Sequence, residues 1–372
     1  MKQASSTKNR LISIDTFRGF TILTMILVNT PGSWSSVYPP LLHADWHGFT
    51  IADYVFPAFV FISGVSMYFS FKHYNGLTKE LNAKLLKRIF WIFAIGLMLN
   101  AFPFFNKDYH QLRIMGVLQR TALAYGLGAY ACILLTKRQL VYLSSAVLLG
   151  YWYILWQFGG ANPYSLNDNI CAKIDNWIIG ENHLWHGKGI PFDPEGLLST
   201  LPATISLILG YLIGSLFENK NKLDLIKQMI PLGLVCLFIG FLWNFLLPIN
   251  KPLWTSSYVV YTTGINCILL ALFIWILDIK SQTWFSKPFI VYGINPLLAF
   301  IISGILVKIS FLFQMGIDAS GKPITLYKWI YENWYVPIWG NLNGSLMFAI
   351  SFIILCWLLL YLAYKKRWIL KV

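Results

Sequence analysis

The sequence predicts an all-α, polytopic integral membrane protein, a helical bundle of about ten transmembrane helices in a single domain over residues 1–372. Of the 372 residues, 57% are hydrophobic and only 12% are charged, whereas a soluble chain carries about 25% charged residues. The chain also contains ten apolar runs, each close to the roughly 20 residues that cross a bilayer as a helix. This composition excludes an ordinary soluble enzyme. The net charge of +14 does not predict a nucleic-acid partner, because such a site needs basic residues gathered on a polar face.

The apolar runs set the order of the elements. We expect spans at residues 17–34, 50–71, 89–105, 114–135, 139–157, 197–217, 229–247, 257–277, 288–312 and 343–364. Most loops between them are short, but two are long, at about 158–196 and 313–342, and long ordered loops are usually functional. The first is rich in Gly, Asn, Trp and His, and the second in Tyr and Trp; such aromatic residues could grip a sugar ring or anchor the chain at the membrane interface.

The charges in the loops predict the orientation. With the N-terminus inside, the cytoplasmic segments hold 19 Lys and Arg and the opposite side holds 7, while Asp and Glu divide as five and ten. Positively charged residues are retained in the cytoplasm. We therefore expect both termini in the cytoplasm and the two long loops at the outer face.

Ionisable side chains inside or beside spans are costly and indicate function. Asp15 and Arg18 lie three residues apart at the start of the first span, so they pair locally on one helix face or Arg18 meets an anionic ligand. Arg120 has no carboxylate beside it in sequence, so it needs a distant partner or the phosphate or carbonyl of a ligand. Arg113, seven residues earlier, is expected to share its helix face. The amide of Asn29 either satisfies a helix end or hydrogen-bonds a carbonyl.

The densest polar segment precedes the second span. His43 and His47 flank Asp45, which supplies groups that titrate near neutrality beside a carboxylate that could orient them, the minimum for proton transfer. The same spacing on a helix can bind zinc, but the glutamate of an HExxH motif is missing, and we expect no metal. Two interfacial histidines without chemistry are the remaining alternative.

Five segments resemble the heparan-α-glucosaminide N-acetyltransferase-like family of transmembrane acetyltransferases. In chain order they are IDTFRG at 14–19, HADWHGFTIADYVFP at 43–57 with FVFISG at 59–64, GVLQR at 116–120, FDPEGLL at 192–198 and GINPL at 293–297. Together they run through nearly the whole chain.

The resemblance implies transfer of acetyl from cytoplasmic acetyl-CoA, across the membrane, to the amine of a glucosamine-type sugar. It places the active-site histidine on His43, as base or acetyl acceptor, and an oxyanion-donating asparagine on Asn29; Asp45 is expected to assist. The residues expected to bind the cofactor are Arg18, Lys87, Arg88, Gln119 and Arg120. Those expected to bind the acceptor are His47, Asp193, Glu195 and Asn295.

The resemblance also implies partners and a location. They are a sugar acceptor at the outer face, the lipid bilayer and a second copy of the chain in a homodimer. The chain resembles the membrane domain alone, as in bacterial relatives, so we expect the bacterial inner (cytoplasmic) membrane. One alternative is an amino-sugar or oligosaccharide transporter, although the sequence shows no evident pair of broken helices or two-half symmetry. The other is an O- or N-acyltransferase acting on another cell-envelope glycan.

Overall fold

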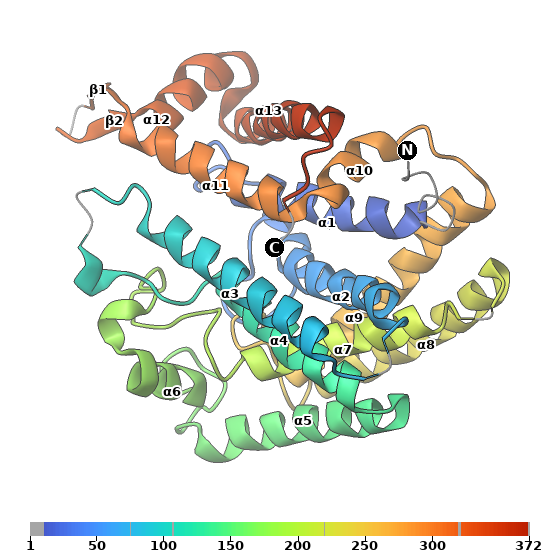
Figure 1. The fold of residues 1–372 in the computed structure, drawn as a ribbon. Helices are drawn as coiled ribbons and strands as arrows, with labels where there is room; N and C mark the ends of the chain where they lie inside the picture. The colour runs from blue at the N-terminus through green and yellow to red at the C-terminus, as the bar shows by residue number, and fades with distance from the viewer. Residues whose placement is uncertain (1–10, 75, 106–107, 219, 319–320, 371–372) are drawn as a thin grey trace.

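The computed structural model describes residues 11–74, 76–105, 108–218, 220–318 and 321–370, and it is mostly α-helical (Figure 1). The helices are α1 (Ile12–Asn29), α2 (Ile51–Phe71), α3 (Lys79–Ala101), α4 (Val117–Leu134), α5 (Lys137–Phe158), α6 (Ile170–Ile179), α7 (Thr200–Ser215), α8 (Lys222–Trp243), α9 (Ser256–Phe273), α10 (Ser286–Ile294), α11 (Pro296–Leu312), α12 (Leu326–Ile330) and α13 (Val336–Lys365). One hairpin pairs β1 (Gln314–Ile317) with β2 (Pro323–Thr325). The predicted helical class is confirmed.

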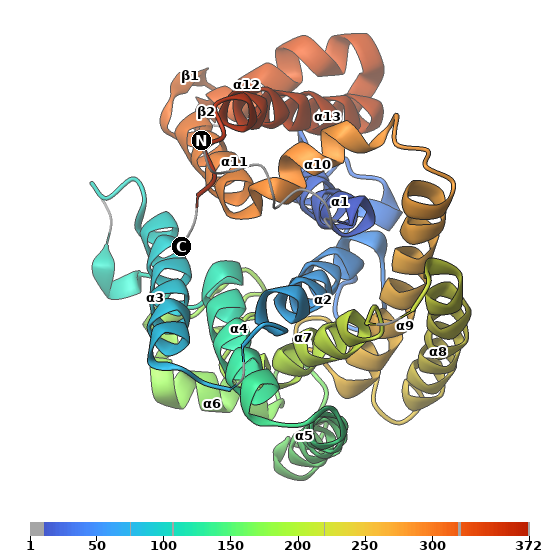
Figure 2. The same cartoon turned by 45° about the vertical axis from the view of Figure 1, so that its right-hand side comes forward.

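Helices α1 and α2 lie inside the bundle, and α5, α8 and α13 lie at its edge (Figure 2). About 70% of the apolar stretch of α1 and of α2 is buried, against 22–33% of that in α5, α8 and α13. Small residues allow two helices of the bundle to pack closely. A Cβ atom on Gly64 of α2 would stand 1.9 Å from the carbonyl oxygen of Leu207 in α7, and one on Gly210 would stand 2.0 Å from that of Phe61. Glycine therefore lets these two helices pack at backbone distance, as membrane helices commonly do.

Within the described residues, six helices are long and apolar enough to cross a membrane by length and composition, or seven if the bent pair α10 and α11 forms one span. Helices α3, α4 and α7 occupy the other three predicted spans, and α7 has only 16 residues. The number ten and the cytoplasmic placement of both ends stay predictions. The basic residues among 1–10, on which the orientation partly depends, lie outside the described part of the chain.

The predicted straight span at 288–312 is broken. Helices α10 and α11 meet at an angle of 88°, because Pro296 cannot continue the hydrogen bonding of a helix and also forces the residue before it out of the helical region. That residue, Asn295, has φ −132° and ψ 55°. No pair of broken helices is evident in the sequence; in the part of the chain that the structure describes there is one such break, at this position.

Both long loops contain regular structure. The segment 158–196 carries α6, and the segment 313–342 carries the hairpin, α12 and the first turns of α13. Helix α13 begins at Val336, before the predicted start at residue 343, and turns sharply at Gly340, whose φ of 71° favours glycine.

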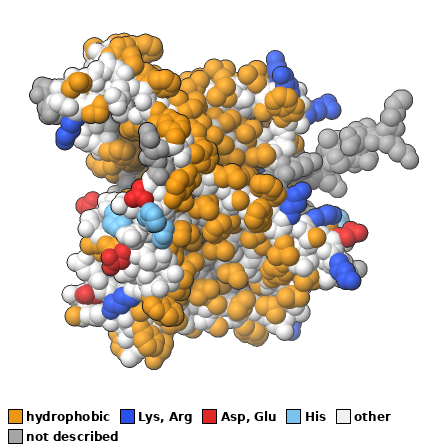
Figure 3. Space-filling view, turned by 60° about the vertical axis from the view of Figure 1, so that its left-hand side comes forward, with side chains coloured by type: hydrophobic (Ala, Val, Ile, Leu, Met, Phe, Trp, Pro, Cys, Tyr) orange, Lys and Arg blue, Asp and Glu red, His pale blue; other side chains and the backbone are white. Residues whose placement is uncertain are grey.

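The surface agrees with a membrane protein. On the face drawn in Figure 3, hydrophobic side chains form a broad band between two polar ends. Lys and Arg gather at one end, while most of the His, Asp and Glu of this face lie at the other. The charge asymmetry of the loops is thus also an asymmetry in space.

Candidate active site

His43 lies in the loop before α2 and is paired with a buried carboxylate at the start of that helix. Asp53 closes a capping box with Thr50, and its Oδ2 also accepts a hydrogen bond from the backbone N–H of Ala44 (3.0 Å). Its Oδ1 lies 2.8 Å from Nδ1 of His43. Since an ionised carboxylate only accepts hydrogen bonds, Nδ1 donates and the lone pair is left on Nε2. The side chain of Asp53 is 3% exposed and that of His43 is 37% exposed, so a fixed acceptor orients an accessible imidazole.

A lysine from a distant segment completes this cluster. Nζ of Lys251, in the turn between α8 and α9, lies 3.2 Å from Nδ1 and 3.3 Å from Nε2 of His43, and 3.9 Å from Oδ1 of Asp53. Burial lowers the pKa of this amine, and the charges of Asp53 and Glu195 oppose that shift. Nothing in the sequence links Lys251 to a histidine 208 residues earlier.

Asp45 does not take the predicted place beside His43. It is exposed, and its backbone carbonyl accepts a hydrogen bond from Nζ of Lys188 (2.6 Å). The carboxylate that contacts the imidazole belongs to Asp53, so the assignment of the orienting role to Asp45 is corrected.

His47 lies apart from His43, with its Nδ1 3.3 Å from the side-chain nitrogen of Asn250. The two histidines are not on a helix, because the segment 42–50 is irregular, so the zinc spacing of a helix does not apply to them. Among the residues with described positions, no three or more His, Cys, Asp or Glu are grouped so that they could hold a metal ion.

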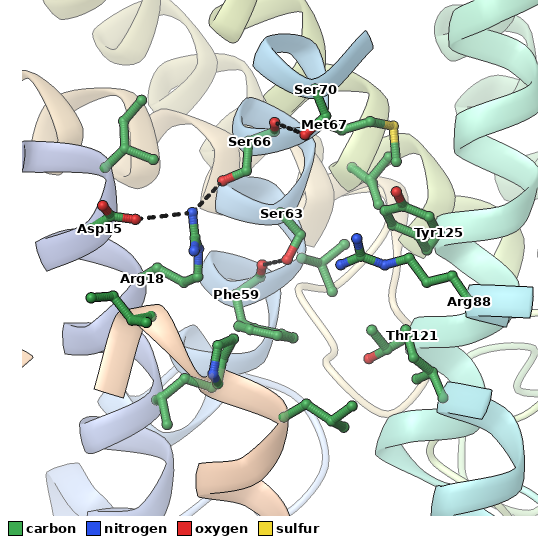
Figure 4. A pocket seen from close by; sticks show the side chains of 18 of the residues that line it. Asp15, Arg18, Phe59, Ser63, Ser66, Met67, Ser70, Arg88, Thr121 and Tyr125 are labelled. Carbon is green, nitrogen blue, oxygen red and sulfur yellow. Dashed lines mark hydrogen bonds and ion pairs between the residues drawn. The ribbon is translucent and has the colours of Figure 1, made fainter. Parts of the chain in front are cut away.

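A cavity of about 790 Å³ opens between α1, α2, α3, α4, α10 and α11. Figure 4 shows Arg18 reaching toward Ser66 of α2, and Arg88 entering from α3 beside Tyr125. The guanidinium of Arg18 donates to Oγ of Ser66 (2.8 Å) and to the carbonyl of Gly293 (2.9 Å), and it lies 3.5 Å from Asp15. The predicted local ion pair is therefore present, and Arg18 lines the cavity as well.

The lining of the cavity changes in character along its length. Lys72 and His73 line it at the end of α2, and the guanidinium of Arg88 stacks over the ring of Tyr125 at 4.5 Å. Farther along, apolar side chains line it, among them those of Met25, Phe59 and Val117. The cavity therefore offers positive charge in one part and an apolar passage in another.

Three of the residues expected at the cofactor do not line this cavity. Lys87 is exposed and is not among the residues that line the cavity. Gln119 donates to the carbonyl of Ile114 (2.9 Å) and packs against Gly96 of α3. Arg120 is fully buried, whereas Thr121 and Tyr125 on another face of α4 line the cavity.

Arg113 holds the two carboxylates that were expected at the acceptor. Its guanidinium donates to both oxygens of Asp193 (2.7 and 2.8 Å) and to Glu195 (2.5 Å). These charges raise the pKa of Arg113 although burial opposes them. Helix α4 begins only at Val117, so the prediction that Arg113 shares a helix face with Arg120 is wrong.

Arg120 lies next to this ion-pair cluster. Its Nη2 donates to Oγ of Ser199 and to the carbonyl of Gly196 (3.3 Å), and the guanidinium lies 5.1 Å from the centre of the Trp254 ring. Among the described residues its Nε and Nη1 have no hydrogen-bond partner. Arg120 thus fixes the segment 193–199 against α4.

Helix α6 adds a buried acid that the sequence did not single out. Oδ1 of Asp175 accepts a hydrogen bond from the backbone N–H of Leu197 (2.8 Å). Burial raises the pKa of this carboxyl to about 7. The amphipathic pattern of residues 170–179 could have identified the helix, but not what Asp175 contacts.

The two asparagines occupy different surroundings. Asn29 is the last residue of α1 and is exposed. Asn295, at the break between α10 and α11, binds the C-terminal segment: Nδ2 donates to the carbonyl of Trp368 (2.9 Å), and Oδ1 accepts from the N–H of Leu370 (3.2 Å). Because Leu370 lines the cavity, Asn295 lies beside the expected donor site and not at the expected acceptor site.

Comparison with known proteins agrees with these features. Residues 10–240 match the family model described as heparan-alpha-glucosaminide N-acetyltransferase, catalytic. Two curated relatives are the heparan-alpha-glucosaminide N-acetyltransferases of Mus musculus (28% identical over 364 residues) and Homo sapiens (27% over 365), each match covering 80% of this chain and 53% of the relative.

The chain therefore spans about half the length of the curated relatives it matches. The family match covers the His43–Asp53 pair and most of the cavity lining, and the apolar helices identify a membrane protein. The chain belongs to the heparan-alpha-glucosaminide N-acetyltransferase family.

Proposed function

We propose that this protein is a transmembrane acetyltransferase that moves acetyl from cytoplasmic acetyl-CoA to the amine of a glucosamine-type sugar at the outer face. One observation carries the proposal. The cavity, whose lining includes Arg18 and Arg88, runs along α2 as far as its C-terminal end. The His43–Asp53 pair lies at the N-terminal end of the same helix.

The cavity suits a slender polyanion. Its volume of about 790 Å³ is within the usual range for ligand pockets, roughly 300–1,000 Å³. Arg18, Lys72 and Arg88 supply positive charge for phosphates, and the apolar part accepts an extended arm. Phe59, in that part, is six residues from Asp53, which is about 9 Å along a helix.

His43 has the features of a base or of a nucleophile. In direct transfer, the acceptor nitrogen bonds to the acetyl carbon, Nε2 takes the proton that this nitrogen loses, and the thiolate leaves. In a two-step route, Nε2 bonds to the acetyl carbon first and the thiolate leaves; the amine then displaces the imidazole, and Nε2 takes the proton that the amine loses. In both routes Asp53 holds the ring, and Asn29 is proposed to donate a hydrogen bond to the carbonyl oxygen as negative charge develops there.

The test is mass spectrometry of glucosamine and other amino sugars incubated with purified protein and acetyl-CoA. Wild type should add one acetyl group to the amine. His43→Ala should abolish the product while leaving CoA binding intact. His110→Ala, an exposed histidine of another loop, is the matched control and should retain activity. Full turnover by His43→Ala would overturn the assignment.

The acceptor is the least constrained part of the proposal. An O- or N-acyltransferase acting on another cell-envelope glycan would use the same donor cavity, and the panel of sugars distinguishes these outcomes. A transporter is favoured by one observation, the 88° break between α10 and α11, since discontinuous helices often form transport sites. Counterflow of labelled sugar in vesicles without acetyl-CoA would support the transporter.

We also propose a location in the bacterial inner membrane, with both termini in the cytoplasm and a homodimer as the working assembly. The separation of basic and acidic ends across the apolar band supports the orientation (Figure 3). Light scattering of the detergent-solubilised protein tests the dimer.

A further inference from the structure

We infer that Lys251 is a positioning residue for His43, whose positive charge opposes the effect of Asp53 on the imidazole and so favours the form of the ring that keeps its Nε2 lone pair. This inference rests on the proposed function of His43 and adds a residue outside the matched segment 10–240. The observation behind it is the three-way contact of an amine, an imidazole and a carboxylate contributed by three separate segments.

The position of the amine decides what it can do. Nζ of Lys251 is 3.2 and 3.3 Å from the two ring nitrogens of His43. A point equally far from both nitrogens cannot lie on the axis of the Nε2 lone pair, which points outward from the ring through that atom. The amine therefore acts on the charge of the ring and leaves the Nε2 lone pair open to a substrate.

The charges around His43 oppose one another. Asp53 alone would favour the imidazolium, because a carboxylate at 2.8 Å stabilises the protonated ring. An imidazolium has no lone pair with which to accept a proton or an acetyl group. A positive charge at about 3 Å disfavours the second proton, so Lys251 counteracts the carboxylate that orients the ring.

The other groups near the cluster do not replace Lys251. Glu195 and Arg120 act on Lys251 from a distance with opposite signs. His47 is bound to Asn250, and Lys188 is bound to a backbone carbonyl. Lys251 is held in place by the cluster, since its side chain is only 17% exposed.

The experiment measures the protonation of His43 in two ways. One is chemical modification of the imidazole, which does not depend on activity, and the other is the pH dependence of acetyl transfer. Diethyl pyrocarbonate acylates the neutral imidazole, and mass spectrometry of the peptide that contains His43 gives the extent of modification at each pH. In Lys251→Met the pH midpoint should rise by about one unit or more, because a like charge that close disfavours the imidazolium and charges within 4–6 Å shift a pKa by about 1–3 units. Lys251→Arg retains the charge and should keep the wild-type midpoint. His110 in the same samples reports any general change in reactivity.

The acid limb of kcat/KM for acetyl transfer should move in the same direction and by the same amount in Lys251→Met, with little loss of kcat on the alkaline side. A lysine that only supports the fold would lower kcat at every pH without moving the midpoint, and that result would overturn the inference. If wild type shows no acetyl transfer and the pH midpoint of His43 modification still rises in Lys251→Met, the proposed function fails and the role of Lys251 stands. If wild type is active and the midpoint does not move, the function stands and this role fails.

Discussion

At the scale of single residues, the carboxylate that serves His43 is the first point to test. Asp53 contacts Nδ1 at 2.8 Å, whereas Asp45 is exposed and offers only a backbone carbonyl to Lys188. Asp53→Asn keeps the shape of the side chain but removes the charge that fixes the tautomer. We expect it to lower kcat by about 100-fold or more, in the range typical of acid–base catalysis.

The matched variant is Asp45→Asn, which should retain nearly full activity. Initial rates at saturating acetyl-CoA compare the two. Equal losses would show that the shared loop, and not the contact with Nδ1, matters.

The proximity of His43 and Asp45 in sequence was misleading for a physical reason. In the irregular segment 42–50, residues two apart do not face each other in any fixed way. Asp53 was visible in the sequence as part of a capping box, a signature of helix starts. The capping role alone explains an aspartate at this position, so nothing in the sequence indicated its contact with His43.

The two neighbouring cations of α3 provide a second test. Both side chains are exposed, but Arg88 lines the cavity and stacks on Tyr125, whereas Lys87 is not part of the lining. Because a hydrogen bond to a charged group contributes about 1.5–3 kcal/mol, Arg88→Gln should weaken CoA binding by about 10-fold or more.

Lys87→Gln removes the same charge one residue away and should leave the affinity nearly unchanged. Isothermal titration with CoA measures both. Equal weakening would mean that the charge of the inner surface as a whole attracts the ligand, and that the cavity does not.

At the scale of elements, α6 holds the segment 193–199 through a buried acid. The pKa of Asp175 is raised to about 7 by burial, above the roughly 3.9 of an unfolded aspartate. The carboxyl is protonated in both states at low pH. As the pH rises from about 4 to 7 the unfolded state loses this proton first, so folding stability is lost across that window.

Asp175→Asn removes the titration and preserves the oxygen that accepts from Leu197. Its melting temperature should therefore exceed that of wild type at pH 8 by more than it does at pH 5. The nearby charges of Arg120 and Asp193 act on Asp175 in opposite directions. Thermal melts at the two pH values measure this, with Asp168→Asn, in a half-buried turn, as the control. A difference in melting temperature that did not change with pH would contradict the prediction.

The break between α10 and α11 shows what hydropathy cannot detect. Residues 288–312 are mostly apolar, and this favours a single span, but Asn295-Pro296 was a local signal for a helix boundary. The contact of Asn295 with Trp368 and Leu370 depends on where the C-terminal segment folds back. No local sequence pattern predicts this folding back of the C-terminal segment. Asn295 was therefore expected at the acceptor site but lies beside the cavity.

At the scale of the whole molecule, composition and the lengths of the apolar runs predicted the helical class and the order of the elements, because both depend on local hydrophobicity. The site was predicted only in part. His43, Arg18 and Arg88 were identified from short motifs and positive charge, whereas Lys251 and Asp175 become neighbours of the site only through tertiary folding. The same distinction applies to Arg120, whose partners Gly196 and Ser199 lie in a segment 76 residues or more away in sequence.

The orientation of the whole molecule in the membrane decides which compartment His43 faces. The loop of His43 contacts the segment 158–196 through the Trp46 indole, which donates to the carbonyl of Tyr164 (2.7 Å). Lys173→Cys in α6 therefore reports the side of His43, and Lys84→Cys at the start of α3 reports the opposite side. Both lysines are exposed, and the five native cysteines are free and buried or half-buried, so background labelling should be low.

If the charges of the loops set the orientation, a membrane-impermeant maleimide should label Lys173→Cys in intact cells, and Lys84→Cys only after permeabilisation. Labelling is read from the mass shift of the purified protein. The reverse pattern would place the histidine and the acceptor in the cytoplasm, where acetyl-CoA is already present. Transfer across the membrane would then be unnecessary, and the length of the cavity along α2 would need another explanation.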